Sequence, residues 1–142
     1  MGITKAEALK AVDRERGPVC EASDRIWDQP ETAFQEFHST DVLCELLEKE
    51  GFRVERNLAG IATAFSGTYG SGKPVVGILG EFDALSGLSQ ESESLEKTAL
   101  VDGAPGHGCG HNLLGTGSVA AAIAVKEYLE KNGKEGTVIF FG

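Results

Sequence analysis

The sequence predicts an α/β domain in which helices and a sheet are layered, helix–sheet–helix. Two observations predict this fold class. Segments with helical spacing of apolar residues are interleaved with short, almost continuous apolar runs, PVVGIL at 74–79 and TVIFF at 137–141, which are typical of buried strands. The chain has 142 residues, 41% of them hydrophobic, which is enough for one domain with a sizeable core.

Three helices are expected before the first strand. Residues 4–16 form a polar helix that ends at the Gly-Pro pair 17–18. A second helix covers about 21–28 and stops before the next proline, because the residue before a proline disfavours the helical conformation. A third helix is capped by Gly51 and is predicted by apolar residues at helical spacing: Val42, Leu43, Leu46 and Leu47.

Short strands are expected at 52–56 and 61–65, before the buried strand 74–79. Between them lies GTYGSGK at 67–73, which fits the first seven positions of a phosphate-binding P-loop. The next residue is Pro74 rather than Ser or Thr, and a strand rather than a helix follows. We therefore interpret this segment as a turn between two strands.

Residues 86–105 are rich in Ser and Glu and form a long loop, which in a compact domain is usually functional or mobile. A helix follows over 112–132, with Asn112 as its N-cap, and strand 137–141 comes last. Trp27, Phe34 and Phe37 are expected in the core, and His38 is expected to be packed or at the surface. The acidic residues of the loop are expected to be solvated: Glu91, Glu93 and Glu96.

The composition excludes several classes of protein. Lys and Arg number 13 against 22 Asp and Glu, a formal net charge of -9, so no nucleic-acid partner is expected. No apolar run approaches the roughly 20 residues that span a bilayer, and residues 1–17 lack the apolar stretch of a secretory signal. No membrane partner is therefore expected. The three cysteines are widely spaced and odd in number, which indicates a reducing compartment such as the cytoplasm.

The densest chemistry lies in GHGCGHN at 106–112. Cys109 and His111 are two residues apart in a glycine-rich segment, and a thiolate with an imidazole suits Zn²⁺ or a similar divalent ion. Since Zn²⁺ takes three or four protein ligands, these two do not complete a site. The alternative is a loop with a buried cysteine and a hydrogen-bonded histidine. His107 is a third ligand or, as we favour, a loop-packing residue.

A second candidate is GEFD at 80–83, directly after the strand 74–79. Glu81 and Asp83 alternate in phase and stand at the carboxyl end of a strand, where α/β enzymes place their sites. One of the two carboxylates can orient a metal-binding histidine. The alternative is a solvated strand end.

These two motifs carry a resemblance to a known family. The segments GILGEFDALSGLSQ (77–90) and GAPGHGCGHNLLGTG (103–117) resemble the metal-dependent aminoacylase and carboxypeptidase superfamily. Within it, the chain looks most like the amidohydrolase branch, whose signature is similar to GHxCGHD, and the segment 29–31 with Phe34 resembles a further motif of that branch. Asn112 stands where the branch has Asp.

The resemblance implies roles for single residues. Cys109 and His111 match two ligands of a site that holds one or two ions, Zn²⁺ or Mn²⁺. Asp83 matches the catalytic-site aspartate that orients the metal cluster. Glu81 stands where related peptidases have a histidine ligand, and it is expected in a supporting position outside the ligands. His107 and Asn112 are expected in similar supporting positions.

The resemblance also implies the fold of a zinc-peptidase-like catalytic domain and the hydrolysis of a small N-acyl amino acid, such as an aroyl-glutamate amide. In the family, a strand similar to TVIFFG is followed by the general base and by further metal ligands. Residues 1–142 are therefore expected to be the N-terminal portion of such a catalytic domain, without the lid domain and inactive alone.

Two alternatives stay open at this point. The chain is a non-catalytic remnant, or a subunit that completes its sheet against another chain or a second copy, since strand 137–141 is expected to have an unpaired side. In the second alternative, Cys109 is a nucleophile activated by a nearby histidine and a helix N-terminus.

Overall fold

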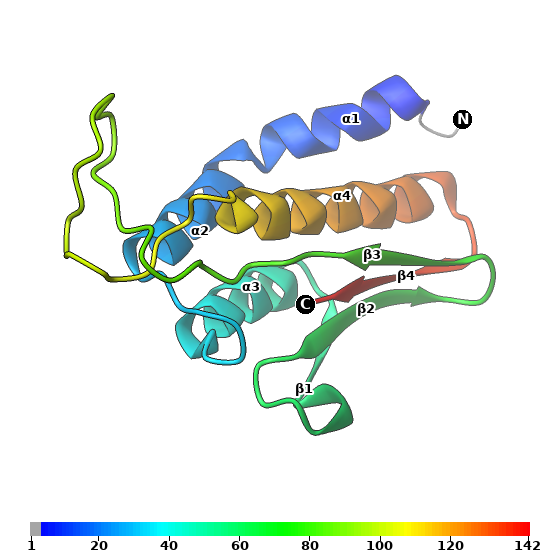
Figure 1. The fold of residues 1–142 in the computed structure, drawn as a ribbon. Helices are drawn as coiled ribbons and strands as arrows, with labels where there is room; N and C mark the ends of the chain where they lie inside the picture. Colours follow the sequence, from blue (N-terminus) through cyan, green and yellow to red (C-terminus); the bar gives the residue numbers. More distant parts are fainter. Residues whose placement is uncertain (1–3) are drawn as a thin grey trace.

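The structure is a computed structural model that describes residues 4–142 (Figure 1). Its elements are α1 (Lys5–Arg14), α2 (Arg16–Asp28), α3 (Phe37–Lys49), β1 (Arg53–Arg56), the short 3-10 helix η1 (Leu58–Gly60), β2 (Phe65–Ser71), β3 (Val75–Leu79), α4 (His111–Asn132) and β4 (Gly136–Phe141). Among these residues, no helix combines the length and the hydropathy that crossing a membrane requires.

The four strands form one mixed sheet in the order β1-β2-β4-β3. Strand β2 pairs antiparallel with β1 and with β4, whereas β3 and β4 are parallel and are connected through α4. Strand β4 therefore has a neighbour on each side, and the expectation that 137–141 has an unpaired side is wrong. The preceding strands supply both neighbours, and the open edges of the sheet are β1 and β3.

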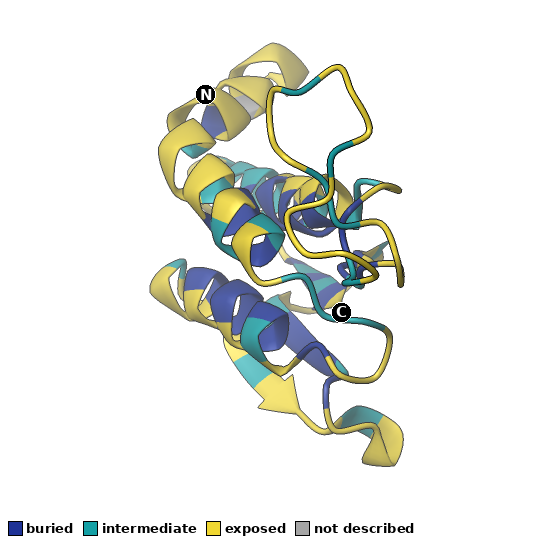
Figure 2. Cartoon of the chain, turned by 60° about the vertical axis from the view of Figure 1, so that its left-hand side comes forward, coloured by how far each residue is buried: buried dark blue, intermediate teal, exposed yellow. Residues whose placement is uncertain are grey.

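The α/β class is confirmed, with the helices packed against one face of the sheet. Along β4, Val138 and Phe140 are fully buried, whereas Phe141 is 38% exposed on the other face. Figure 2 shows the buried residues gathered where the helices meet the sheet. Within residues 4–142 the fold has two layers, and the second helical layer expected from the sequence is not among them. The larger side chains of the core are Ile26, Val42, Leu43, Leu46, Leu47, Phe52, Phe65, Phe82, Val119, Ile123, Val138 and Phe140.

Strand β3 is found where it was predicted, but it is not buried. Val75 is 57% exposed, Val76 43% and Leu79 70%. The physical reason is the position of β3 at the edge, where it pairs with β4 alone. An apolar run predicts a strand, but its burial depends on neighbours that the run does not specify.

Several predicted boundaries also differ. Helix α2 begins at Arg16, so the Gly-Pro pair 17–18 lies in its first turn, where a helix needs no N–H from the proline. The predicted strand 61–65 is wrong, because turns precede Phe65, where β2 begins. Most of GTYGSGK is therefore strand, and the chain turns only at about 72–74 before β3. The absence of a helix after this segment agrees with the exclusion of a P-loop.

The predicted core aromatics are also corrected. Phe34 is 66% exposed and Phe37 54% exposed, because they lie in and just after the loop that leads into α3. Trp27 and His38 are partly buried. The acidic residues of the long loop are exposed, as predicted: Glu91, Glu93 and Glu96.

Candidate metal site

The two sequence motifs meet at one end of the sheet. Strand β3 ends at Leu79, and Glu81 and Asp83 follow directly. Because β3 runs parallel to β4 and α4 runs back between them, α4 begins at the same end, on the left in Figure 1. After β3, the backbone at Gly80 packs closely against the ring of Phe140. A Cβ at this position would lie 2.7 Å from that ring. The fold thus brings together residues that are 28 positions apart in the sequence.

His111, the first residue of α4, is held between two carboxylates. Its Nδ1 lies 2.7 Å from Oδ1 of Asp83, and its Nε2 lies 3.2 Å from Oε2 of Glu81. The side chains of His111 and Asp83 are 19% and 26% exposed, whereas that of Glu81 is 56% exposed. Asp83 therefore fixes the orientation of the ring, and Glu81 contacts the nitrogen on the open side.

Backbone contacts hold the two motifs side by side. The Ala84 amide donates to the Glu31 carbonyl at 2.7 Å, and Leu85 and Gly106 exchange two hydrogen bonds of 3.0 Å. At Gly106 a Cβ would meet the Leu88 carbonyl at 2.0 Å, so this position requires glycine. The glycines of GHGCGHN thus serve close packing of the loop.

The structure also shows a supporting residue to which the sequence analysis gave no role. The carboxylate of Glu31 accepts hydrogen bonds from the backbone amides of His38 and Ser39 and from the Ser39 hydroxyl, at 2.8–2.9 Å. It ties the start of α3 to the strand-like segment beside Ala84. The signal for it in the sequence was its place in the segment 29–31, which resembles a motif of the amidohydrolase branch.

Cys109 and His107, in the same motif GHGCGHN, differ in their surroundings. Cys109 is an exposed free thiol. His107 is buried and stacks on Trp27, with ring centroids 6.3 Å apart. Burial lowers the pKa of His107 below its ordinary range, and the nearby Ile26 backbone and Asp83 act in the opposite direction.

Asn112 is not the N-cap of α4 as predicted. The cap is Gly110, in the left-handed conformation with φ 86°, and no side chain caps the helix. Asn112 lies too deep in the first turn for that role and is buried, with its amide donating to the Ser23 hydroxyl at 3.0 Å. It joins α4 to α2 instead of contacting the carboxylates around His111.

The donors present fit one side of a metal centre. A metal-binding imidazole usually donates its second N–H to a carboxylate, and Asp83 stands in that place beside His111. Within residues 4–142, however, no group of three or more His, Cys, Asp and Glu side chains is arranged to hold a metal ion.

No protein-family model matches the chain. It is 51% identical to one of the subunits of p-aminobenzoyl-glutamate hydrolase from Escherichia coli over 93% of its length, which is 27% of that protein. It is 28% identical to the human Xaa-Arg dipeptidase over 90% of its length, which is 28% of that protein. The chain thus spans about a quarter of the length of the curated relatives it matches.

Solved structures agree in fold. A protein from methicillin-resistant Staphylococcus aureus matches 97% of this chain and 34% of its own with a TM-score of 0.75, and at 23% identity this shows the fold alone. A dinuclear metal-binding peptidase of the M20 family from Bacillus subtilis matches 89% of this chain and 35% of its own, with a TM-score of 0.64 and 25% identity. By sequence the chain is similar to part of p-aminobenzoyl-glutamate hydrolase, and by fold it is similar to part of a peptidase of the M20 family.

Proposed function

We propose that the chain forms one side of the metal centre of an amidohydrolase that cleaves N-acyl amino acids, with an aroyl-glutamate amide as the favoured substrate. One observation carries this proposal: His111, two residues after Cys109 in the sequence, is held between Asp83 and Glu81 in a chain 51% identical to part of p-aminobenzoyl-glutamate hydrolase. An imidazole held by a carboxylate, together with a thiol, is a donor set suited to Zn²⁺, and the carboxylate oxygens of Asp83 and Glu81 suit Mn²⁺.

Each residue has a separate role in this proposal. Cys109 and His111 bind the metal, and Asp83, by accepting a hydrogen bond from Nδ1, leaves the lone pair of the His111 Nε2 to the metal. Glu81 is exposed beside Nε2 and is available to a second ion or to a water molecule. A bound divalent ion would polarise the amide carbonyl and lower the pKa of a coordinated water molecule.

The remaining donors and the general base come from outside residues 4–142 in this proposal. It is supported by the small number of donors grouped here and by the match to about a quarter of each curated relative. The relative from Escherichia coli is itself one subunit of a hydrolase, which favours a partner chain or a second copy as one source of those residues. The three free cysteines favour the cytoplasm as the compartment.

The other functions weighed from the sequence have less support. A subunit without catalytic residues would not need the pairing of Asp83 with His111, which holds a ligand-type imidazole in place. Nucleophilic chemistry at Cys109 needs a base in contact with the thiol, and the contacts of His111 are with Asp83 and Glu81.

Calorimetric titration with Zn²⁺ and with Mn²⁺ tests the metal site, with the oligomeric state measured on the same sample. We expect one weak site in the wild type, and Cys109→Ser and His111→Gln to weaken it by about tenfold or more. Cys20→Ser is the matched control, since Cys20 is also an exposed free thiol but lies on α2. Wild-type heats that match those of Cys109→Ser would overturn the proposal.

A hydrolysis assay with p-aminobenzoyl-glutamate tests whether catalysis needs residues from outside this chain. The chain alone is expected to show no metal-dependent turnover. Turnover that disappears in Cys109→Ser would keep the assignment of the metal ligands and refute the need for residues from outside the chain.

A further inference from the structure

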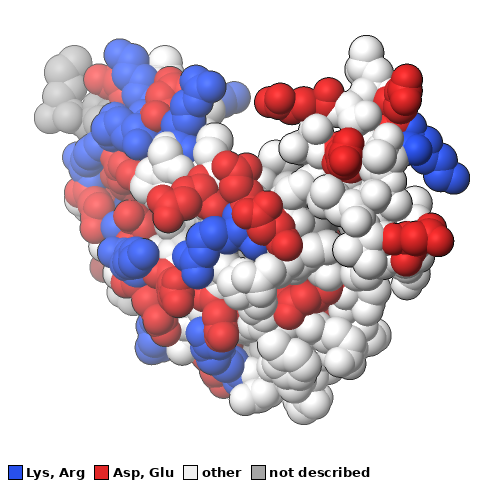
Figure 3. All heavy atoms as spheres, turned by 90° about the vertical axis from the view of Figure 1, so that its left-hand side faces the viewer, with Lys and Arg blue, Asp and Glu red and all other residues white. Residues whose placement is uncertain are grey.

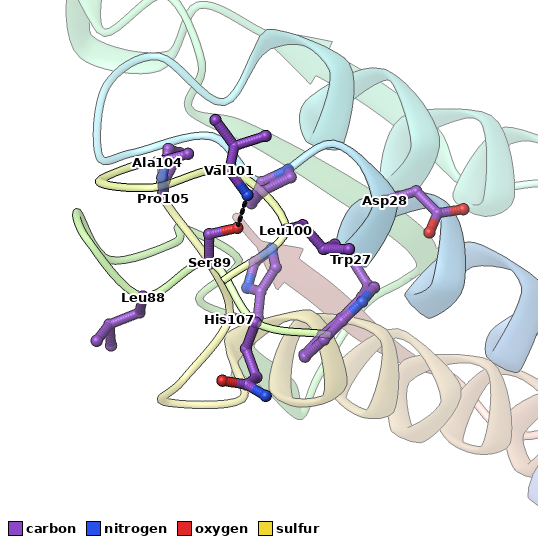
Figure 4. A pocket seen from close by; sticks show the side chains of 12 residues that line it. Trp27, Asp28, Leu88, Ser89, Leu100, Val101, Ala104, Pro105 and His107 are labelled. Carbon is purple, nitrogen blue, oxygen red and sulfur yellow. Dashed lines mark hydrogen bonds between the residues drawn. The ribbon is translucent and has the colours of Figure 1, made fainter. Parts of the chain in front are cut away.

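A cavity of about 320 Å³ lies between the end of α2 and the long loop (Figure 4). None of Glu81, Asp83, Cys109 and His111 lines it. Its volume falls in the range of small-molecule pockets. Its walls include Trp27, Pro30, Leu100, Val101, Ala104 and His107.

Hydrogen bonds within the loop form the loop side of the cavity. The Val101 amide donates to the Ser89 hydroxyl at 3.1 Å, drawn as a dashed line in Figure 4. The Ser89 amide donates to the Ala104 carbonyl at 3.0 Å. These bonds close the loop on itself, so the cavity exists without a ligand, and binding need not order the loop.

The opposite wall is flat and aromatic. The rings of Trp27 and His107 are stacked with an angle of 30° between their planes. His107 is only 5% exposed, and neither of its ring nitrogens makes a hydrogen bond of normal geometry, although the Ile26 backbone lies near the ring. Burying a polar group without a hydrogen bond costs free energy. A ligand that hydrogen-bonds to His107 would therefore remove this cost.

The charges around the cavity restrict what it can bind. Asp28 is the only charged residue among those that line it, and no Lys or Arg is among them. In Figure 3 most basic side chains gather on the side where the chain begins, and the opposite side shows mainly uncharged residues with scattered charged ones, most of them Asp and Glu. An anion placed in the cavity would therefore find no countercharge.

We propose that this cavity is a binding site for a neutral aromatic amide, with its ring on the wall formed by Trp27 and His107. Aromatic rings pair favourably in offset or tilted geometry, and the aliphatic side chains of Leu100 and Val101 cover the other side. An amide carries both a donor and an acceptor, so it can pair with an imidazole nitrogen in either tautomer. The site does not depend on the proposed metal centre.

Trp27 reports directly on this site, because it is the only tryptophan in the chain. We would titrate the chain with p-aminobenzamide and p-aminobenzoate, which differ in charge but share the ring, and follow tryptophan fluorescence. Saturable quenching is expected, with p-aminobenzamide binding about tenfold or more tightly than p-aminobenzoate. Equal binding of the two, or quenching that does not saturate, would overturn the proposal.

A matched pair of variants tests the location. Ala104→Phe places a ring in the cavity and is expected to weaken p-aminobenzamide binding by about tenfold or more. Leu95→Phe adds a ring on the same loop at a fully exposed side chain and should bind like the wild type. If Ala104→Phe does not fold, nuclear Overhauser contacts between the ligand ring and the Trp27 indole in the wild type decide the question, and their absence at saturation refutes the site.

The same fluorescence assay distinguishes whether the bound aromatic ring belongs to an N-aroyl amino acid or to a free aromatic amide. Saturable quenching by p-aminobenzoyl-glutamate would identify the ligand as the aroyl group of an N-aroyl amino acid. Quenching by p-aminobenzamide alone would identify a free aromatic amide. Loss of metal binding in Cys109→Ser with unchanged quenching would show that the two sites are separate.

Discussion

Strands β3 and β4 are neighbours with similar apolar sequences and opposite surroundings. Strand β4 pairs on both sides and buries Val138 and Phe140 completely, whereas β3 pairs on one side and leaves Leu79 70% exposed. The difference shows that apolar composition sets the tendency to form a strand, while the position in the sheet sets burial. It also divides the molecule into a packed part, centred on β4, and an open part that carries Glu81, Asp83 and the long loop.

The largest expected effect separates these two parts directly. Phe140→Ala should lower the free energy of unfolding by about 3–5 kcal/mol, because it removes a buried ring that packs on Phe65. Leu79→Ala should cost less than about 1 kcal/mol, because its side chain is already in solvent. Urea unfolding of both variants measures the difference. Equal losses would mean that β3 is covered in solution.

The cysteines extend the comparison to pH. Cys44, in α3, is fully buried, and burial raises the pKa of its thiol to about 12. The folded chain therefore keeps this proton in a range where the unfolded chain loses it, so stability falls as the pH rises above about 9, by up to about 1.4 kcal/mol per pH unit. Cys44→Ala should flatten this alkaline slope in urea unfolding between pH 8 and 10.5.

Alkylation by iodoacetamide independently measures the difference in solvent accessibility between the buried and the exposed cysteines. In the native chain Cys20 and Cys109 are exposed and should react, whereas Cys44 should react only after unfolding. Cys44 that labels as fast as Cys109 at pH 8 would refute its burial in solution.

The open part is tested by the contact that orients His111. Asp83→Asn should reduce Zn²⁺ affinity by about 10–100-fold. The neutral amide would hold the imidazole less firmly and would make His111 a less basic ligand for the metal. Glu91→Gln removes a carboxylate from the exposed loop and serves as the control. Calorimetry on both variants measures the effect, and equal affinities for Asp83→Asn and the wild type would contradict the role given to Asp83.

The site was predicted from sequence more fully than the surfaces around it. GEFD follows a strand and GHGCGHN precedes a helix, and in an α/β fold both positions lie at the same end of the sheet, so the meeting of Asp83 with His111 followed from local pattern. The exposure of Phe34 and Leu79 and the contact of Asn112 with Ser23 depend on which elements pack together. No local pattern contains that information, and the cavity beside Trp27 escaped prediction for the same reason.

The smallest expected effect concerns the open edge itself. Val75→Lys places a charge on β3 at a side chain that is 57% exposed, and it should change the free energy of unfolding by no more than about 0.5 kcal/mol. Exposed apolar edges invite pairing with another strand, and an edge lysine opposes it. If light scattering shows the wild type to associate and Val75→Lys to be monomeric at equal stability, β3 is the contact. A loss of stability above about 2 kcal/mol would instead mean that Val75 is buried in solution, and the contrast between β3 and β4 would then fail.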